Sequence, residues 1–154
     1  MTPMPNAEHP NAKVVRRLYD AFARGDMETT KSCFVHDAVW HLLGRSPIAG
    51  DHHGVDAIIR FFGKLKELSG GTFKAELNDV VANDRHAVAL QHATGTRGTK
   101  RLDVTACQVM RIQDGKILEV RGYYPDQYAL DDLWSQALIS YFRLLLRSGG
   151  AGGI

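Results

Sequence analysis

The sequence predicts a single α+β domain in which helices cover one face of a curved antiparallel sheet. Apolar residues recur at helical spacing through about residue 69, and they alternate with a period of two from Thr72 to about residue 125. Helices therefore come first and strands follow, without the strand–helix–strand alternation that accompanies parallel sheets. The length of 154 residues suits one domain of ordinary size.

The first helix follows from an apolar stripe near the N-terminus. Asn11 fits as the cap before this stripe, and Gly25 fits as the stop after it. Asp26 can then cap a short second helix that reaches about Phe34, ahead of a buried strand over 38–43. The stripe of the first helix consists of Val14, Val15, Leu18, Tyr19 and Phe22.

A third helix is predicted after a loop over 46–54, and Gly70-Gly71 ends this helical half of the chain. Alternation then predicts four strands, at about 72–82, 85–96, 101–113 and 116–125. Because the connections between them are short, we expect an antiparallel meander. The third helix presents Val55, Ile58, Ile59, Phe62 and Leu65 on one face.

The two ends of the chain differ in composition from its middle. Residues 1–10 are polar and contain three prolines, and residues 149–154 are rich in glycine, so both segments are predicted to be flexible. A folded domain is expected over 11–128, followed by an amphipathic helix over 129–148. That helix could close a pocket or form a dimer contact. Its apolar face consists of Leu130, Leu133, Trp134, Ala137, Leu138, Tyr141, Phe142 and Leu145.

Composition and motifs argue against several classes of function. Nineteen Lys and Arg against seventeen Asp and Glu leave a charge of +2 without a basic stripe, so nucleic acid is not an expected partner. No apolar run is long enough for a membrane span. Two cysteines without a pairing pattern, and no secretory leader, indicate the cytoplasm. Cofactor motifs and metal-ligand spacings are missing, so no cofactor and no metal is expected.

Alternation along the strands predicts which side chains face the helices. In the strand over 101–113, Val104, Ala106 and Gln108 share the expected inner face. The same reasoning places Leu90 and His92 inside on the preceding strand. Together with Tyr124 on the inner face of the last strand, these residues predict an apolar pocket for a small organic ligand, with His92, Gln108 and Tyr124 as its polar points.

Three short motifs occur in a set order along the chain. They are Val15–Phe22 with Gly25-Asp26, Gly54–Ile58 with Phe61-Phe62, and Asp114–Ile117 with Glu119, Tyr123 and Asp126. In this order and spacing, residues 11–135 resemble the SnoaL-like branch of the nuclear transport factor 2-like superfamily. The resemblance implies a cone-shaped sheet closed by helices, a homodimer formed through the outer sheet face, and acid–base chemistry without a cofactor.

The catalytic carboxylates of the enzymes in this superfamily are mostly replaced here. Leu18 and Leu42 stand where ketosteroid isomerases place a tyrosine and a basic aspartate, and Gln108 stands where they place a second aspartate. Gly122 replaces the late aspartate of polyketide cyclases and limonene epoxide hydrolases. These departures count against each of those three named activities.

Three residues are candidates for chemistry. His92 can act as a general base or acid, or it can be a core histidine that hydrogen-bonds to the backbone or water. Gln108 can donate its amide to a ligand carbonyl or a developing enolate, or it can be a plain buried polar group. Asp126 can orient His92, although capping the final helix is the simpler role.

Further residues are candidates for lining the ligand pocket. Trp40 and His41 are adjacent on a strand, so one of them should face inward, and bulk favours Trp40. Tyr124 can donate a hydrogen bond or pack as an aromatic at the pocket mouth. The expected ligand-binding residues are Tyr19, Trp40, His41, Phe62, Leu65, Leu90, Val104, Ala106 and Tyr124.

Three functions are therefore open. The first is a cofactor-independent acid–base enzyme, of isomerase, cyclase or hydrolase type, that acts on a small apolar oxygenated substrate through His92 and Gln108. The second is a protein of the same fold that binds a small ligand without chemistry, which the missing carboxylates favour. The third is a dimeric interaction module, which the long apolar C-terminal helix suggests.

Overall fold

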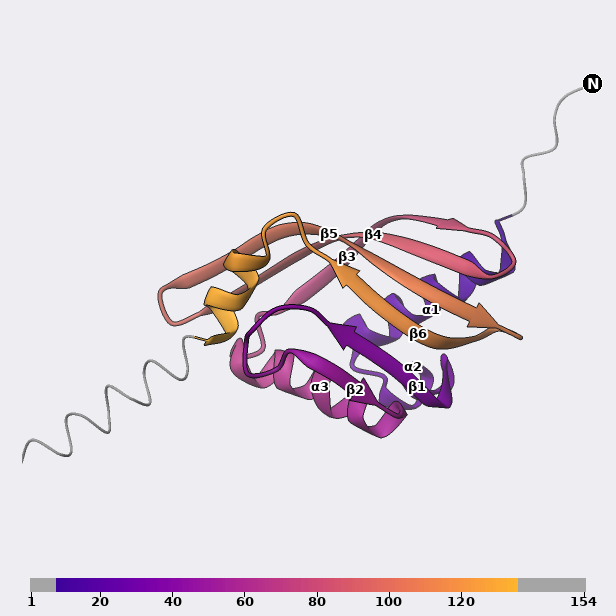
Figure 1. Ribbon diagram of the computed structural model, residues 1–154, viewed down its shortest axis with the longest axis horizontal. Helices are drawn as coiled ribbons and strands as arrows, with labels where there is room; N and C mark the ends of the chain where they lie inside the picture. The colour runs from indigo at the N-terminus through magenta and orange to yellow at the C-terminus, as the bar shows by residue number, and fades with distance from the viewer. Residues whose placement is uncertain (1–7, 136–154) are drawn as a thin grey trace, which may run out of the picture.

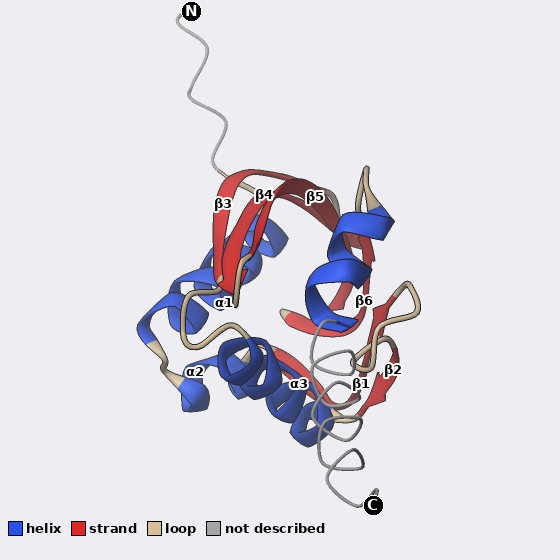
Figure 2. Cartoon of the chain, turned by 90° about the vertical axis from the view of Figure 1, so that its left-hand side faces the viewer, coloured by secondary structure: helices blue, strands red, loops and turns tan. Residues whose placement is uncertain are grey.

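The computed structural model describes residues 8–135 and shows a strongly curved six-stranded sheet with helices along its concave side (Figures 1 and 2). The strand order is β2-β1-β6-β5-β4-β3. The helices are α1 (Pro10–Arg24), α2 (Met27–Ser32) and α3 (Val55–Leu68). The strands are β1 (Phe34–Leu42), β2 (Gly50–His53), β3 (Lys74–Ala82), β4 (His86–Arg97), β5 (Lys100–Gln113) and β6 (Lys116–Tyr123). Residues 127–135 form a last helical segment.

The α+β class and the curved sheet predicted from the sequence are confirmed, but the sheet is mixed rather than wholly antiparallel. β3 to β6 form the expected antiparallel meander, whereas β1 pairs with β6 in parallel. The segment expected to be a loop contains β2, a four-residue strand that pairs with β1. Its alternation is invisible in the sequence because it is a short edge strand whose side chains are mostly exposed.

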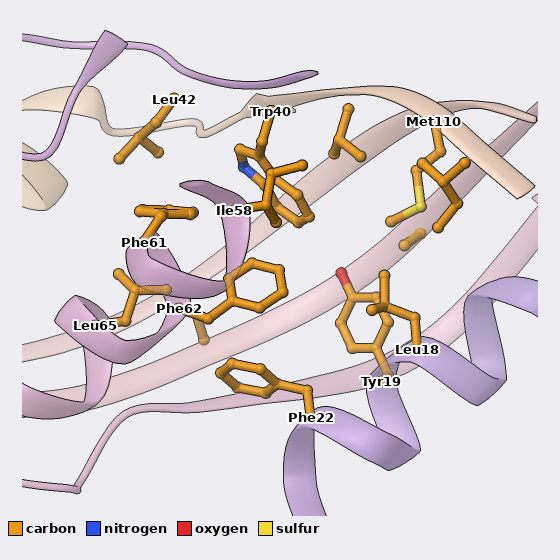
Figure 3. Close-up of a cluster of buried hydrophobic side chains, with 14 of the residues drawn as sticks. Leu18, Tyr19, Phe22, Trp40, Leu42, Ile58, Phe61, Phe62, Leu65 and Met110 are labelled. Atoms are coloured by element: carbon orange, nitrogen blue, oxygen red, sulfur yellow. The ribbon is translucent and has the colours of Figure 1, made fainter. Parts of the chain in front are cut away.

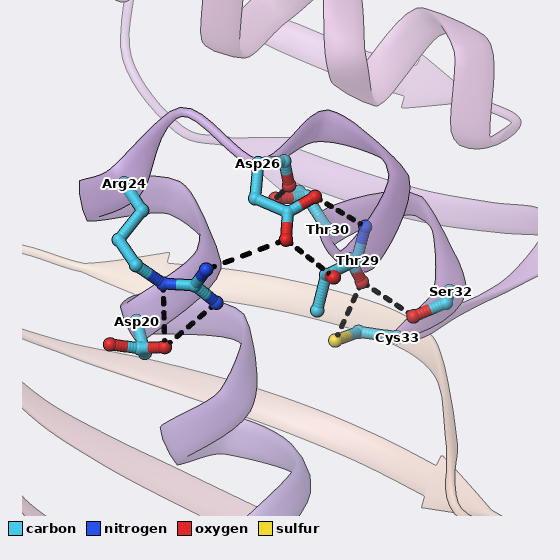
Figure 4. A network of polar contacts seen from close by, with 7 residues as sticks. All are labelled: Asp20, Arg24, Asp26, Thr29, Thr30, Ser32 and Cys33. Carbon is cyan, nitrogen blue, oxygen red and sulfur yellow. Dashed lines mark hydrogen bonds and ion pairs between the residues drawn. The ribbon is translucent and has the colours of Figure 1, made fainter.

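The turn between α1 and α2 depends on one glycine and one capping carboxylate (Figure 4). Gly25 adopts φ 69°, a left-handed conformation that ends α1 at little steric cost. Asp26 then caps α2 as predicted, since its side chain accepts a hydrogen bond from the Thr29 backbone N–H at 3.0 Å. The predicted Asn11 cap is wrong, because His9 caps α1 and Asn11 instead donates to the Asn83 carbonyl at 2.9 Å.

The core lies between the concave face of the sheet and the helices α1 and α3 (Figure 3). Val15 on α1 and Ile58 on α3 are completely buried, and Met110 on β5 closes the core from the sheet side. Full burial of an aliphatic side chain stabilises a fold by roughly 1.5–3 kcal/mol. None of the helices within residues 8–135 is long and apolar enough to cross a membrane.

The last helical segment forms hydrogen bonds with both the β1–β2 loop and the β4–β5 hairpin. On one side, the Asp131 carboxylate accepts hydrogen bonds from the backbone N–H groups of Arg45 and Ser46. On the other, Arg97 donates to the Trp134 carbonyl at 2.8 Å. The segment starts at 127 rather than at the predicted 129. Residues 136–148 of the predicted helix, and the predicted tail over 149–154, lie outside the described residues.

Candidate ligand-binding pocket

A pocket lies between α1, α3 and the concave face of the sheet, with a free volume of about 50 Å³. Helical spacing directs Leu18, Tyr19 and Phe22 of α1 toward it, and α3 contributes Phe62 and Leu65 in the same way. In Figure 3 the Tyr19 hydroxyl points away from α1 toward the sheet. The remaining lining residues lie on the sheet or directly next to a strand: Trp40 of β1, Phe73 before β3, Ala75 of β3, Gln91 of β4, Gln108 of β5 and Tyr124 after β6.

Aromatic rings form most of the apolar wall of this pocket. Phe62 is the central ring: its centroid lies 5.1 Å from that of Trp40 and 5.3 Å from that of Phe22, both in edge-to-face arrangements. Phe22 in turn lies 6.3 Å from Phe73, again edge to face. Such pairs stabilise one another beyond the area they bury, so this wall holds a defined shape.

Four neutral polar side chains meet in the pocket. The Tyr19 hydroxyl donates a hydrogen bond to Oε1 of Gln91. The Nε2 group of Gln108 donates to the Tyr124 hydroxyl at 3.2 Å. Gln91 and Gln108 are only 4% and 3% exposed, so these amides depend on the pocket, rather than on bulk water, for their hydrogen bonds.

One atom of this cluster lacks a partner. Within the described residues, Oε1 of Gln108 is buried and accepts no hydrogen bond. If the amide is turned over, Nε2 becomes the unpaired atom, so one polar atom of Gln108 is unsatisfied in either orientation. A buried polar group without a partner costs about 1–3 kcal/mol, which a ligand atom can recover.

Gly122 makes room for the Gln108 amide. The two residues are direct partners across the β5–β6 ladder, so their side chains share a face. A Cβ atom at position 122 would lie 2.8 Å from Oε1 and 3.2 Å from Nε2 of Gln108. The glycine therefore lets the amide lie flat over β6 beside Tyr124.

Both pocket tyrosines are held in their neutral form. Burial raises the pKa of Tyr124 to about 12, although its contacts with the amides of Gln108 and Gln91 oppose that shift. Burial also raises the pKa of Tyr19, and the neighbouring Tyr124 adds to the effect. Among the residues that the structure describes, no carboxylate, imidazole or ammonium group lines this pocket. Its polar side chains can donate and accept hydrogen bonds, but none is suited to exchange protons near neutral pH.

The predicted inward orientation of His92 is wrong. On β4 the residues Ala87, Ala89, Gln91 and Ala93 face the core, whereas Leu90 and His92 lie on the opposite, convex face. There the His92 ring nitrogen Nε2 lies 2.5 Å from Oδ1 of Asp103. The alternation was misassigned because β4 carries small alanines inside and larger apolar residues outside. Leu90 is therefore also wrong as a pocket residue.

His41 is likewise wrong as a pocket residue. Trp40 faces inward, as its bulk predicted. Adjacent residues of a strand point to opposite faces, so His41 faces outward. The two His41 ring nitrogens contact Oδ1 of Asp51 at 2.5 Å and Oε1 of Glu119 at 2.9 Å. These contacts tie β1 to its two neighbouring strands. Within residues 8–135, no three side chains of the metal-binding types come together at one point.

The remaining candidates divide into those that line the pocket and those that do not. Asp126 is exposed, and its carboxylate accepts a hydrogen bond from the Ala129 N–H at 3.0 Å, which is the capping alternative. Val104 and Ala106 face the core but are not part of the pocket lining. The predicted residues that do line it are Tyr19, Trp40, Phe62, Leu65, Gln108 and Tyr124.

Gln91 is the polar pocket residue that sequence reasoning missed. The signal that could have found it is the β4–β5 turn, where Arg97 pairs with Lys100 across the two residues 98 and 99. This turn sets the register of the whole hairpin and makes Gln91 the direct partner of Ala106. Because direct partners share a face, an inward Ala106 requires an inward Gln91.

The curved sheet, the helices on its concave side and the apolar pocket between them define an α+β cone. Residues 15–120 match the SnoaL-like domain family, and the chain belongs to that family. The resemblance inferred from the sequence motifs is thus confirmed.

Known relatives agree with this assignment. The structure of Bal32a, from a soil-derived mobile gene cassette, is 44% identical with a TM-score of 0.79, and the match covers 81% of this chain and 96% of that one. The uncharacterized protein Rv0034 of Mycobacterium tuberculosis is 30% identical over 123 residues, which cover 79% of this chain and 94% of that protein. TerC, co-crystallized with polyporic acid, is 21% identical with a TM-score of 0.71, covers 81% and 98% of the two chains, and shows the shared fold alone.

Proposed function

We propose that this protein binds a small apolar molecule through a single oxygen function, and that it does so without acid–base chemistry. The observation that carries the proposal is the unpaired side-chain atom of Gln108, buried beside Tyr124 in an otherwise apolar pocket. A ligand hydroxyl can donate to Oε1 of Gln108, and a ligand carbonyl can accept from the reversed amide. Either contact would complete the hydrogen bonds of the cluster.

The composition of the pocket supports binding over catalysis. A general base works best when its pKa lies near the working pH, and the titratable groups that line this pocket are two tyrosines with raised pKa values. His92, the base expected from the sequence, lies on the other face of the sheet. Of the functions left open by the sequence, the one without chemistry therefore has the stronger support. TerC, which shares the fold, was co-crystallized with a small molecule.

The hydrogen-bonding role can be tested with two ligands of nearly equal shape, 2-naphthol and 2-methylnaphthalene. We expect calorimetry to show that 2-naphthol binds about five- to tenfold more tightly, as one additional hydrogen bond provides. Gln108→Leu should remove that difference. Gln113→Leu, at the exposed end of the same strand, should preserve it. Equal affinities of the unaltered protein for the two ligands would refute the proposal.

The absence of acid–base chemistry can be tested with 2-tetralone, whose protons next to the carbonyl exchange with heavy water. We expect nuclear magnetic resonance to give the same exchange rate with and without the protein. A saturable acceleration by the protein would instead favour the enzyme. Repeating the experiment with His92→Ala and Gln108→Leu would then show whether either residue is responsible.

The predicted cytoplasmic location and the predicted homodimer remain proposals. The homodimer is supported by an apolar patch on the convex face, where Val88 pairs with Val109, and Cys107 lies between Leu90 and Tyr123. Tyr123 is 50% exposed, which is unusual for a large aromatic side chain on a sheet. Light scattering should report a dimer that Val109→Lys dissociates and Gln113→Lys does not. A monomeric unaltered protein would count against it.

A further inference from the structure

A second, wider cavity adjoins the pocket and has a volume of about 620 Å³. Phe22, Phe73 and Ala75 line both spaces, so these side chains form the partition between them. The inner pocket, at about 50 Å³, has room for only a few water molecules. An organic ligand that reaches Gln108 would therefore extend through this partition into the wider cavity.

Two lysines stand at this outer cavity. Lys66, near the end of α3, lies over the Phe22 ring with Nζ 4.8 Å from the ring centroid. Its Nζ also contacts the Phe22 carbonyl oxygen at 3.4 Å, a long hydrogen bond that leaves most of its donor capacity unused. Lys74, at the start of β3, is exposed and pairs with Thr94, so it lies on the convex side of the sheet with Glu76 and His92 rather than on the pocket side.

Lys66 has no carboxylate partner among the described residues. Within residues 8–135, no carboxylate lies within ion-pair distance of Lys66, whereas Lys64 pairs with Glu67 at 3.2 Å. Glu76 lines the convex part of the cavity with Lys74, and His92 beside it is engaged by Asp103 at 2.5 Å. Lys66 therefore supplies the positive charge on the pocket side of this cavity.

We propose that the ligand is an amphipathic organic anion, whose apolar body extends from the inner pocket across the partition into the wider cavity while its carboxylate binds Lys66. This inference rests on the proposed function, since it assigns the opposite end of the same ligand. Phe22 carries the Lys66 ammonium on its face and separates the two cavities. Movement of the Phe22 ring would therefore affect both the entry of the apolar body and the position of the Lys66 ammonium that contacts the anion.

The test compares 6-hydroxy-2-naphthoic acid with its methyl ester, which has the same hydroxyl and nearly the same shape but no charge. We expect calorimetry at low salt to show the acid binding about fivefold more tightly than the ester, because partly exposed ion pairs are weak. This preference should shrink in 0.5 M NaCl, since salt screens such pairs. Lys66→Met should abolish the preference for the acid while leaving the preference for 2-naphthol over 2-methylnaphthalene unchanged. Met retains an apolar stem over Phe22.

Lys64→Met is the matched control, because Lys64 lies on the same helix but does not line the cavity. It should keep the preference for the acid. Equal binding of acid and ester, or a preference that survives Lys66→Met, would overturn the anion assignment. If 2-naphthol is still preferred over 2-methylnaphthalene in that case, the proposed function stands and this inference alone fails. If no hydroxyl preference exists, both are rejected.

Discussion

The two faces of the sheet carry polar groups of different kinds. On the concave face, Gln91 and Gln108 are neutral, nearly inaccessible to solvent, and hydrogen-bonded to tyrosines. On the convex face, His41 and His92 contact carboxylates and remain partly exposed. Within the described residues, the side chains that line the pocket are therefore neutral near pH 7, whereas these histidines and their carboxylate partners lie on the convex face. Neutral groups suffice for binding, but proton transfer would require a group whose pKa lies near the working pH.

The largest expected effect compares a side chain on each face. Phe62→Ala should lower the free energy of unfolding by about 3–5 kcal/mol, because it removes the central ring of the aromatic wall. Leu90→Ala, on the convex face, should cost less than about 1 kcal/mol in an isolated chain. Chemical denaturation measures both values. A Leu90→Ala cost similar to that of Phe62→Ala would show that the convex face is buried in an assembly.

A smaller effect separates two glycines. Gly122→Ala should cost about 1–3 kcal/mol and weaken 2-naphthol binding, because the new Cβ would crowd the Gln108 amide. Gly63→Ala lies within α3, where a Cβ meets no other atom within 4 Å, and should stabilise the fold by up to about 1 kcal/mol. Thermal and chemical unfolding of the two variants provide the comparison. If Gly122→Ala is tolerated as well as Gly63→Ala, then the close packing of the amide is not needed.

The smallest effect concerns acid stability and depends on the convex face. Hydrogen bonding from His92 lowers the pKa of Asp103, and hydrogen bonding from His41 lowers the pKa of Asp51. A carboxyl whose pKa is lower in the folded state stabilises the fold above its unfolded value of about 4, and that contribution is lost as the pH falls through the folded value. The melting temperature should therefore fall below about pH 4.

Variants can assign this acid-labile contribution to the histidine pairs. Asp103→Asn and Asp51→Asn should each flatten the dependence of the melting temperature on pH. Asp37→Asn, at an exposed position on β1, serves as the matched control and should leave it unchanged. Identical acid profiles for all three variants would show that the convex pairs contribute nothing to the pH dependence.

Sequence reasoning was most successful where the periodicity was strong. The stripes of α1 and α3 identified the helices and the five pocket residues that lie on them, namely Leu18, Tyr19, Phe22, Phe62 and Leu65, although Leu18 and Phe22 were not named as ligand contacts. The meander also followed from its short turns. The position of β1 against β6 could not be read, because parallel pairing between distant segments leaves no local pattern.

The polar part of the site was less accessible to such reasoning. Alternation along β4 separates its residues into two faces but does not show which face is buried. Because the buried face carries small alanines, the pattern favoured the opposite face, so His92 was predicted inside and Gln91 outside. The β4–β5 turn contains the missing information, because its register links Gln91 to Ala106. Gln108 could be placed correctly because large apolar residues on β5 mark its face clearly.

A crystal structure with bound 2-naphthol would test the central claim most directly. The naphthol oxygen should lie within about 3.2 Å of a side-chain polar atom of Gln108, with the rings packed against Phe62 and Trp40. A ligand bound on the convex face beside His92, or one seated in the pocket with its oxygen turned away from Gln108, would contradict that claim.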